Sequence, residues 1–133
     1  LSLVPLLKGQ AQALPERALF WHFPAYLQAG GSIEGVESRD PLFRTRPCSI
    51  IRQGPWKLHQ YFEDGGLELY HLTDDLGETR NLAQSHPQKT QELLQRLKRW
   101  QERVKAPIPQ EPEPAFDAVA EAAAIRKMKR STR

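Results

Sequence analysis

The chain has 133 residues, with 19 lysines and arginines against 16 aspartates and glutamates, which gives a formal charge of +3 at pH 7. No apolar run approaches the roughly 20 residues that a membrane span requires, and the single cysteine excludes an internal disulfide and a thiolate metal cluster. Changes in composition predict three regions: a link at residues 1–16, a folded core at residues 17–106, and a proline-rich linker with a basic tail, expected to be mobile, at residues 107–133.

The first third of the chain predicts one short helical turn and one strand. Leucines at residues 3, 6 and 7 are spaced for a helical turn that closes at Gly9. Residues 17–24 form a dense apolar run, typical of a buried strand that ends at Pro24. Residues 28–47 are rich in glycine, proline and charge, and predict a long loop of the kind that is functional or disordered.

Three alternating runs follow, at residues 48–53, 56–62 and 67–72, separated by turns at Gly54 and Gly65. Period-two patterning between glycine turns predicts antiparallel strands joined by hairpins. We expect Gln60 to pair with Leu69 and Leu58 with His71, with one apolar face and one mixed face.

An amphipathic helix is predicted at residues 85–106, where it would cover the apolar face of the sheet. Ser85 is a suitable N-cap, Pro87 fits the first turn, and Gln88 fits a capping box. The apolar stripe repeats at helical spacing at Leu93, Leu97, Trp100 and Val104. Prolines at 107 and 109 should stop the helix. The sequence therefore predicts an α+β fold, with a small antiparallel sheet of about four strands, one long helix, and an extended or partly helical C-terminal tail.

Three residues are candidates for substrate binding. His22 lies at the end of the first predicted strand and could donate a hydrogen bond to an anionic or sugar substrate, or it could be a core histidine satisfied by the backbone. Tyr26 and Arg44 could join it at a cleft rim, because arginine suits bidentate binding of sulfate or carboxylate. A plain surface role is the alternative for both.

The sequence contains no convincing metal site. In the predicted register His59 and His71 lie on opposite faces of the sheet and cannot form a metal pair. Carboxylates at Asp74, Asp75 and Glu78 could attract a cation, or could cap backbone N–H groups of a structural loop. Cys48 falls within a predicted strand and fits a buried structural thiol.

Several motifs occur together in one order. They read S-L-x-P-L-L-K-G at residues 2–9, R-A-L-F-W-H-F-P-x-Y at 17–26, S-I-I-R-x-G-x-W-K-L at 49–58 and E-L-Y-x-L-x-x-D-x-G-E-x-x-N-L-A at 68–83, followed by the amphipathic helix. This arrangement resembles the C-terminal subdomain of the arylsulfatase-type sulfatases, within the alkaline-phosphatase-like superfamily, separated from its catalytic domain. Pro55 and Leu76 depart from the family, which often has an acidic residue and a proline there.

The resemblance implies that the chemistry belongs to a larger α/β domain. There a cysteine in a C-x-P-S-R motif becomes formylglycine, and a calcium ion stabilises the sulfate oxygens. Cys48 lacks that motif, so no catalytic residue, metal ligand or cofactor is assigned to this chain. Residues 1–16 would be the remnant of the link from the catalytic domain, which would be the partner, in cis or as a split chain. A sulfated substrate would lie at the cleft rim, and the resemblance suggests a periplasmic or secreted location.

Two functions follow. The first is the C-terminal part of a sulfuric ester hydrolase, which supports the fold, walls one side of the substrate cleft and is not catalytic alone. The alternative is a free-standing basic protein that binds a protein partner or nucleic acid through its tail. A basic chain end is more often simply solvated, so nucleic acid is not the expected partner. No membrane partner is expected.

Overall fold

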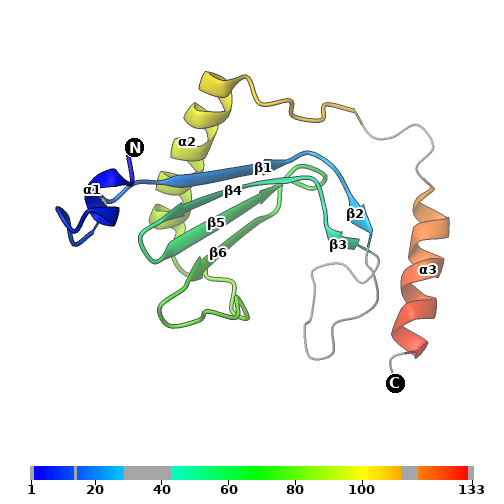
Figure 1. Cartoon of the computed structure of the whole chain (residues 1–133). Helices are drawn as coiled ribbons and strands as arrows, with labels where there is room; N and C mark the ends of the chain where they lie inside the picture. The colour runs from blue at the N-terminus through cyan, green and yellow to red at the C-terminus, as the bar shows by residue number, and fades with distance from the viewer. Residues whose placement is uncertain (1, 14, 29–42, 112–116, 132–133) are drawn as a thin grey trace.

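The computed structural model describes residues 2–13, 15–28, 43–111 and 117–131. Its centre is a four-stranded antiparallel sheet in the order β1-β4-β5-β6, formed by β1 (Leu19–Phe23), β4 (Cys48–Gln53), β5 (Trp56–Tyr61) and β6 (Leu67–His71). Figure 1 shows these strands side by side, with β1 and β6 at the two edges. The α+β fold and the four strands predicted from the sequence are confirmed.

The hairpin between β5 and β6 turns one residue earlier than predicted. Gln60 lies opposite Leu67 rather than two residues further along. The Tyr61 N–H donates to the Gly66 carbonyl at 2.9 Å, and Gly65 takes a φ of 66°, the left-handed conformation that closes this turn. The predicted register is therefore wrong by two residues. Because two residues are one full period of a strand, every side chain stays on its predicted face.

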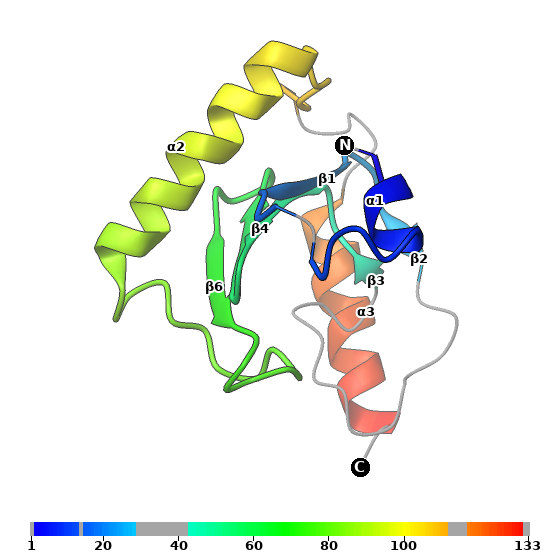
Figure 2. The same cartoon turned by 60° about the vertical axis from the view of Figure 1, so that its left-hand side comes forward.

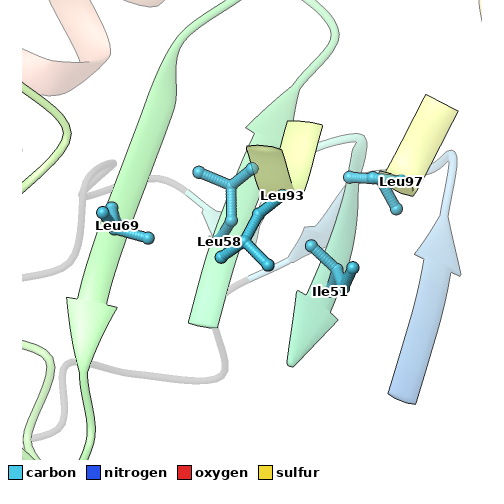
Figure 3. Packing of buried hydrophobic residues seen from close by; sticks show 5 residues of the cluster. All are labelled: Ile51, Leu58, Leu69, Leu93 and Leu97. Carbon is cyan, nitrogen blue, oxygen red and sulfur yellow. The ribbon is translucent and has the colours of Figure 1, made fainter. Parts of the chain in front are cut away.

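The long helix α2 (Pro87–Val104) crosses one face of the sheet, as Figure 2 shows. Leucines from the helix meet apolar side chains from three strands and form a core in which each side chain is at most 1% exposed. Its members, seen in Figure 3, are Ile51, Leu58, Leu69, Leu93 and Leu97. At the β1 side Trp100 stacks on Phe20, with ring centroids 4.9 Å apart. The sheet thus obtains the apolar cover that a few strands need for stability.

Both ends of α2 differ from the prediction. The N-cap is His86, without a side-chain cap, because the Ser85 hydroxyl instead donates to the Leu82 carbonyl at 3.1 Å. At the other end Lys105 adopts a left-handed φ of 52°, and the Ala106 N–H returns to the Gln101 carbonyl at 2.9 Å. This hydrogen-bonded reversal ends the helix before the prolines are reached.

A second, two-stranded sheet lies where only a loop was predicted. It pairs β2 (Leu27–Gln28) with β3 (Phe43–Thr45), while residues 29–42 of the predicted loop lie outside the described residues. β2 follows β1 and β3 precedes β4, so the ribbon carries their antiparallel pairing further. Prolines 24 and 47 lie at the two junctions, and because proline has no N–H to donate, they separate the ribbon from the main sheet.

The segment between β6 and α2, residues 72–86, is called the elbow, and it is held by capping of backbone groups. The Asp75 carboxylate accepts hydrogen bonds from the Thr79 N–H at 3.0 Å and the Arg80 N–H at 2.8 Å. These donors favour the charged form and lower the Asp75 pKa. The predicted capping role is confirmed for this residue.

The elbow also closes the outer edge of β6. The Asn81 carboxamide oxygen accepts from the Leu69 N–H at 3.1 Å, and its amide donates to the Leu67 carbonyl at 3.2 Å. The Leu82 N–H donates to the Leu69 carbonyl at 2.7 Å. These bonds satisfy backbone groups that an edge strand would otherwise leave open.

Two further helices lie outside this core: α1 (Val4–Leu7) before β1, and α3 (Ala118–Ser131) in the C-terminal tail. Figure 1 shows α3 standing apart from the sheet, beyond the β2–β3 ribbon. None of the described helices combines the length and apolar character that crossing a bilayer demands. The predicted region boundaries at residues 16 and 107 stay predictions.

Replacing a central core side chain should destabilise the whole fold. Leu58→Ala removes a fully buried side chain between β4, β6 and α2, and should lower the free energy of unfolding by about 2–5 kcal/mol, since a cavity remains. Urea denaturation measures the change. The control is Leu76→Ala, at a residue that is 82% exposed, which should leave the midpoint unchanged; equal losses in both variants would contradict the assigned core.

Asp75 should contribute stability only while it is charged. Its pKa lies below the ordinary value of 3.8, so its contribution is complete above that value and is lost as the pH falls through the lowered pKa. Asp75→Asn should therefore be less stable than the natural chain at pH 7, and the difference should shrink as the pH falls below about 4. Denaturation at a series of pH values tests this, and a difference independent of pH would contradict it.

Candidate functional site

The predicted substrate-binding residues gather at one end of the sheet, where β1 leaves and β4 begins. His22 lies in β1 on the side of α2, opposite Ser49. Its Nδ1 is 2.7 Å from the Ser49 hydroxyl, and its Nε2 is 3.2 Å from the Pro107 carbonyl. Since a carbonyl only accepts, Nε2 carries the proton, and in the neutral ring Nδ1 accepts from the serine. Both nitrogens therefore have partners within the chain.

These two hydrogen bonds give His22 a clear structural task. Ser49 is fully buried, so its hydroxyl needs a partner, and Pro107 belongs to the segment just after α2. The imidazole thus ties β1 and β4 to the chain that leaves the helix. This geometry supports the core alternative, and a contact between His22 and substrate stays a prediction.

Tyr26 belongs to a cluster that the sequence did not reveal. Its ring packs on Phe43 of β3, with centroids 4.9 Å apart, and its hydroxyl donates to Glu63. The same carboxylate pairs with Arg46, whose guanidinium lies 5.7 Å from the Phe43 ring centroid. Tyr26, Phe43, Arg46 and Glu63 are called the sheet-end cluster below.

The sheet-end cluster forms because the β4–β5 pairing continues past its last strand residues. The Phe62 N–H donates to the Pro47 carbonyl at 3.0 Å, which brings the residues beside them, Arg46 and Glu63, together. The Phe62 ring also lies 5.7 Å from His22. His22 and Tyr26 thus attach to consecutive residues of one turn. Arg44 lies in β3, the strand that pairs with β2, and its side chain is outside the described residues.

No single motif signalled Arg46 or Glu63. They are 17 residues apart in sequence, and each stands beside a turn-forming residue, where charge is ordinary. The usable signal was the register: a hairpin at Gly54 places Cys48 opposite Tyr61, and Arg46 and Glu63 each lie two residues beyond that pair. An Arg and a Glu at this spacing could have been predicted to meet.

The face of the sheet away from α2 carries a second polar group, in β5, β6 and the elbow. Glu78 accepts from Lys57 Nζ at 2.6 Å, and its other oxygen lies 3.1 Å from His59 Nε2. Glu78 reaches them from a left-handed φ of 55°, which is uncommon outside glycine. Burial and, after it, the Lys57 charge lower the His59 pKa. Lys57, His59 and Glu78 are called the β5 triad below.

Glu68 serves the neighbouring tyrosines on the same face. The hydroxyls of Tyr61 and Tyr70 both donate to its Oε2, at 3.1 and 3.0 Å. Burial and the nearby carboxylate raise the Tyr70 pKa, so this phenol stays protonated and acts as a donor. The polar groups of this face therefore satisfy one another.

A surface hollow of about 490 Å³ opens at the opposite end of the sheet, between the elbow and the start of α2. It is lined by Trp56, His71, Asp74, Asp75, Thr79, Arg80, Leu82 and His86. His71 Nδ1 lies 2.6 Å from Asp74 Oδ2, but without the alignment of a hydrogen bond. His71 packs on Trp56, on the α2 side, whereas His59 lies on the other face, as predicted.

The described residues do not fit the groups that the family resemblance implies for a catalytic domain. Within residues 2–13, 15–28, 43–111 and 117–131, no three His, Cys, Asp or Glu side chains converge as ligands for a metal ion. Cys48 is buried in β4, where burial raises its thiol pKa, so it is poorly placed for conversion or attack. No chemical step is assigned to this chain through calcium or formylglycine.

Comparison with known proteins by sequence and by structure finds relatives of the same kind. No family model matches the chain. It is 32% identical over 103 residues to a protein named "Sulfatase" from Formosa agariphila, a match that covers 72% of this chain and 16% of that protein. It also resembles the solved structure of a 2-O GAG sulfatase, with a TM-score of 0.53 and 28% identity, over 80% of this chain and 20% of that one.

The chain thus spans about a sixth to a fifth of the length of these relatives. The match includes most of the chain, and the four strands and the helix α2 make up the fold that the resemblance implied. This chain is a sulfatase-related C-terminal subdomain.

Proposed function

We propose that this chain is the C-terminal part of a sulfuric ester hydrolase, in which it supports the fold and walls one side of the substrate cleft. The observation that carries the proposal is the sulfatase relationship over most of the chain combined with its small share of each relative. The formylglycine and calcium chemistry would belong to a separate large domain, in the same polypeptide or in a split partner. An extracytoplasmic location is proposed on the family resemblance alone.

The end of the sheet is the proposed cleft wall. It carries the predicted residues His22, Tyr26 and Arg44 from three neighbouring segments, and the sheet-end cluster holds Tyr26 in place through Glu63. A sulfated substrate would meet Tyr26 and Arg44 at the rim, because a phenol and a guanidinium can both donate to sulfate oxygens. His22 would support this wall by tying it to the segment after α2.

Sulfate ester hydrolysis should require the large domain. The 133-residue chain alone should release no sulfate from an aryl sulfate, because its described residues bring no three potential metal ligands together and Cys48 is buried. The complete polypeptide, meaning this chain joined to the large domain encoded in frame upstream, should release sulfate. Hydrolysis by the isolated chain, or the lack of any upstream large domain in frame or as a separate chain, would overturn the proposal.

The His22→Ala variant tests whether this histidine is structural or contacts substrate. Because the ring satisfies buried Ser49 and the Pro107 carbonyl, its loss should reduce the free energy of unfolding by about 1–3 kcal/mol. Urea denaturation of the chain and kinetics of the complete polypeptide provide the two measurements. The control is His86→Ala, at the far end of the sheet. Unchanged stability with a raised KM would instead assign His22 to the substrate.

A further inference from the structure

Among the described residues, most of the exposed large apolar side chains lie between α1 and β2. Leu7 is 79% exposed, Trp21 48% and Phe23 41%. With Leu3, Val4 and Leu27 they form what we call the N-terminal strip. Figure 1 shows β1 at one edge of the main sheet, with α1 before it and β2 after it along the chain. Single exposed apolar residues are normal on a surface, whereas several in neighbouring elements are typical of an interaction site.

The two edges of the sheet are treated differently. The outer edge of β6 is closed by Asn81 and Leu82. In the part of the chain that the structure describes, no backbone hydrogen bond closes the outer edge of β1. The β1 sequence Leu-Phe-Trp-His-Phe also lacks the charges and prolines that usually protect an edge. β1 therefore presents an open, uncharged edge that can accept another strand.

Trp21 and Phe23 of β1 point to the face of the sheet that α2 leaves uncovered. Phe20 faces α2, where it stacks on Trp100, so its neighbours along the strand face the other way. Trp21 lies opposite Ile50 and Phe23 opposite Cys48. These two rows are apolar, and the next row along, Leu19 opposite Arg52, adds one charge at the end of the β1–β4 half of the open face. The β5–β6 half of this face carries the β5 triad together with Glu68, Tyr61 and Tyr70. The polar groups of these residues already have partners.

We propose that the N-terminal strip is the docking seam for the large domain of a sulfatase, which adds a strand to the outer edge of β1 and covers Trp21 and Phe23 with apolar side chains. This inference rests on the proposed function and specifies the surface through which it acts. The occupant is argued from size: the chain spans 16% of one sulfatase and 20% of another, so most of a sulfatase polypeptide lies outside it. Strand addition would pair the open backbone N–H and C=O groups of β1, and the partner would also cover the apolar side chains of the strip.

Two matched variants test the strip in the isolated chain. Trp21→Lys/Phe23→Lys adds two charges within the strip, and Leu76→Lys/Val119→Lys adds two at exposed residues elsewhere, which are 82% and 79% exposed. The natural chain should bind a hydrophobic dye, the first variant should lose most of this signal, and the second should keep it. Equal dye binding by both variants would overturn the strip as the exposed apolar surface.

Hydrogen exchange then locates the seam. In the complete polypeptide the outward amides of β1 should exchange about 100-fold more slowly than in the isolated chain, whereas those of β6 should change little because Asn81 and Leu82 already cover that edge. The Trp21→Lys/Phe23→Lys variant should abolish the added protection, and the Leu76→Lys/Val119→Lys control should retain it.

The outcomes separate this inference from the proposed function. A complete polypeptide that hydrolyses sulfate esters without protecting β1 overturns the seam and leaves the proposed function standing. If no large domain associates with the chain at all, both fail. An isolated chain that dimerises with β1 protected, and keeps that pairing beside the large domain, assigns the edge to a second copy and overturns the proposal.

Discussion

The packing of Leu93 and Leu97 against the sheet is the contact on which the rest of the structure depends. These two leucines meet one central residue from each of β4, β5 and β6, and all are nearly inaccessible to water. Each such side chain contributes about 1.5–3 kcal/mol when fully buried, and no comparable core exists elsewhere in the described chain. Because this contact sets the position of α2, it also places the end of the helix beside β1, where Pro107 reaches His22.

The sheet is therefore covered by α2 on one face, whereas part of its other face stays exposed. On the α2 side, apolar residues are covered, and even the polar pair Gln60 and Gln101 is joined by a hydrogen bond of 3.1 Å. On the opposite side, the polar half near β6 is satisfied internally, and the half near β1 exposes aromatic rings. This asymmetry is what a subdomain that packs against a larger domain would show, because such packing would bury the β1 edge and the exposed half-face beside it.

The sheet-end cluster and the surface hollow differ in what they could do. The hollow is lined by side chains that already serve the elbow: Asp75 caps two backbone N–H groups, and His71 lies against Asp74. The sheet-end cluster instead joins the β2–β3 ribbon to the turn after β5, so it fixes the orientation of the whole ribbon rather than of a single loop. The cleft wall is therefore proposed at this end of the sheet, and catalysis is proposed to belong to a separate large domain.

Much of this arrangement was determined by the sequence alone. Period-two patterning and glycine turns specified the strands, the leucine stripe specified α2, and the ordered motifs indicated the sulfatase relationship. The predicted face of each β5 and β6 side chain was also correct despite the error in register, because a shift of two residues preserves the alternation of side chains. These features are local, or repeat with a fixed period, and so are visible in a single chain.

Only the tertiary structure decided the features that join distant segments. The ribbon of β2 and β3 depends on pairing across residues 29–42, and the meeting of Arg46 with Glu63 depends on a backbone bond between Pro47 and Phe62. The partners of His22 come from β4 and from the chain beyond α2. The bare edge of β1 likewise becomes apparent only beside the closed edge of β6. Each is a contact between segments far apart in sequence, and its energy depends on a geometry that local patterns do not contain.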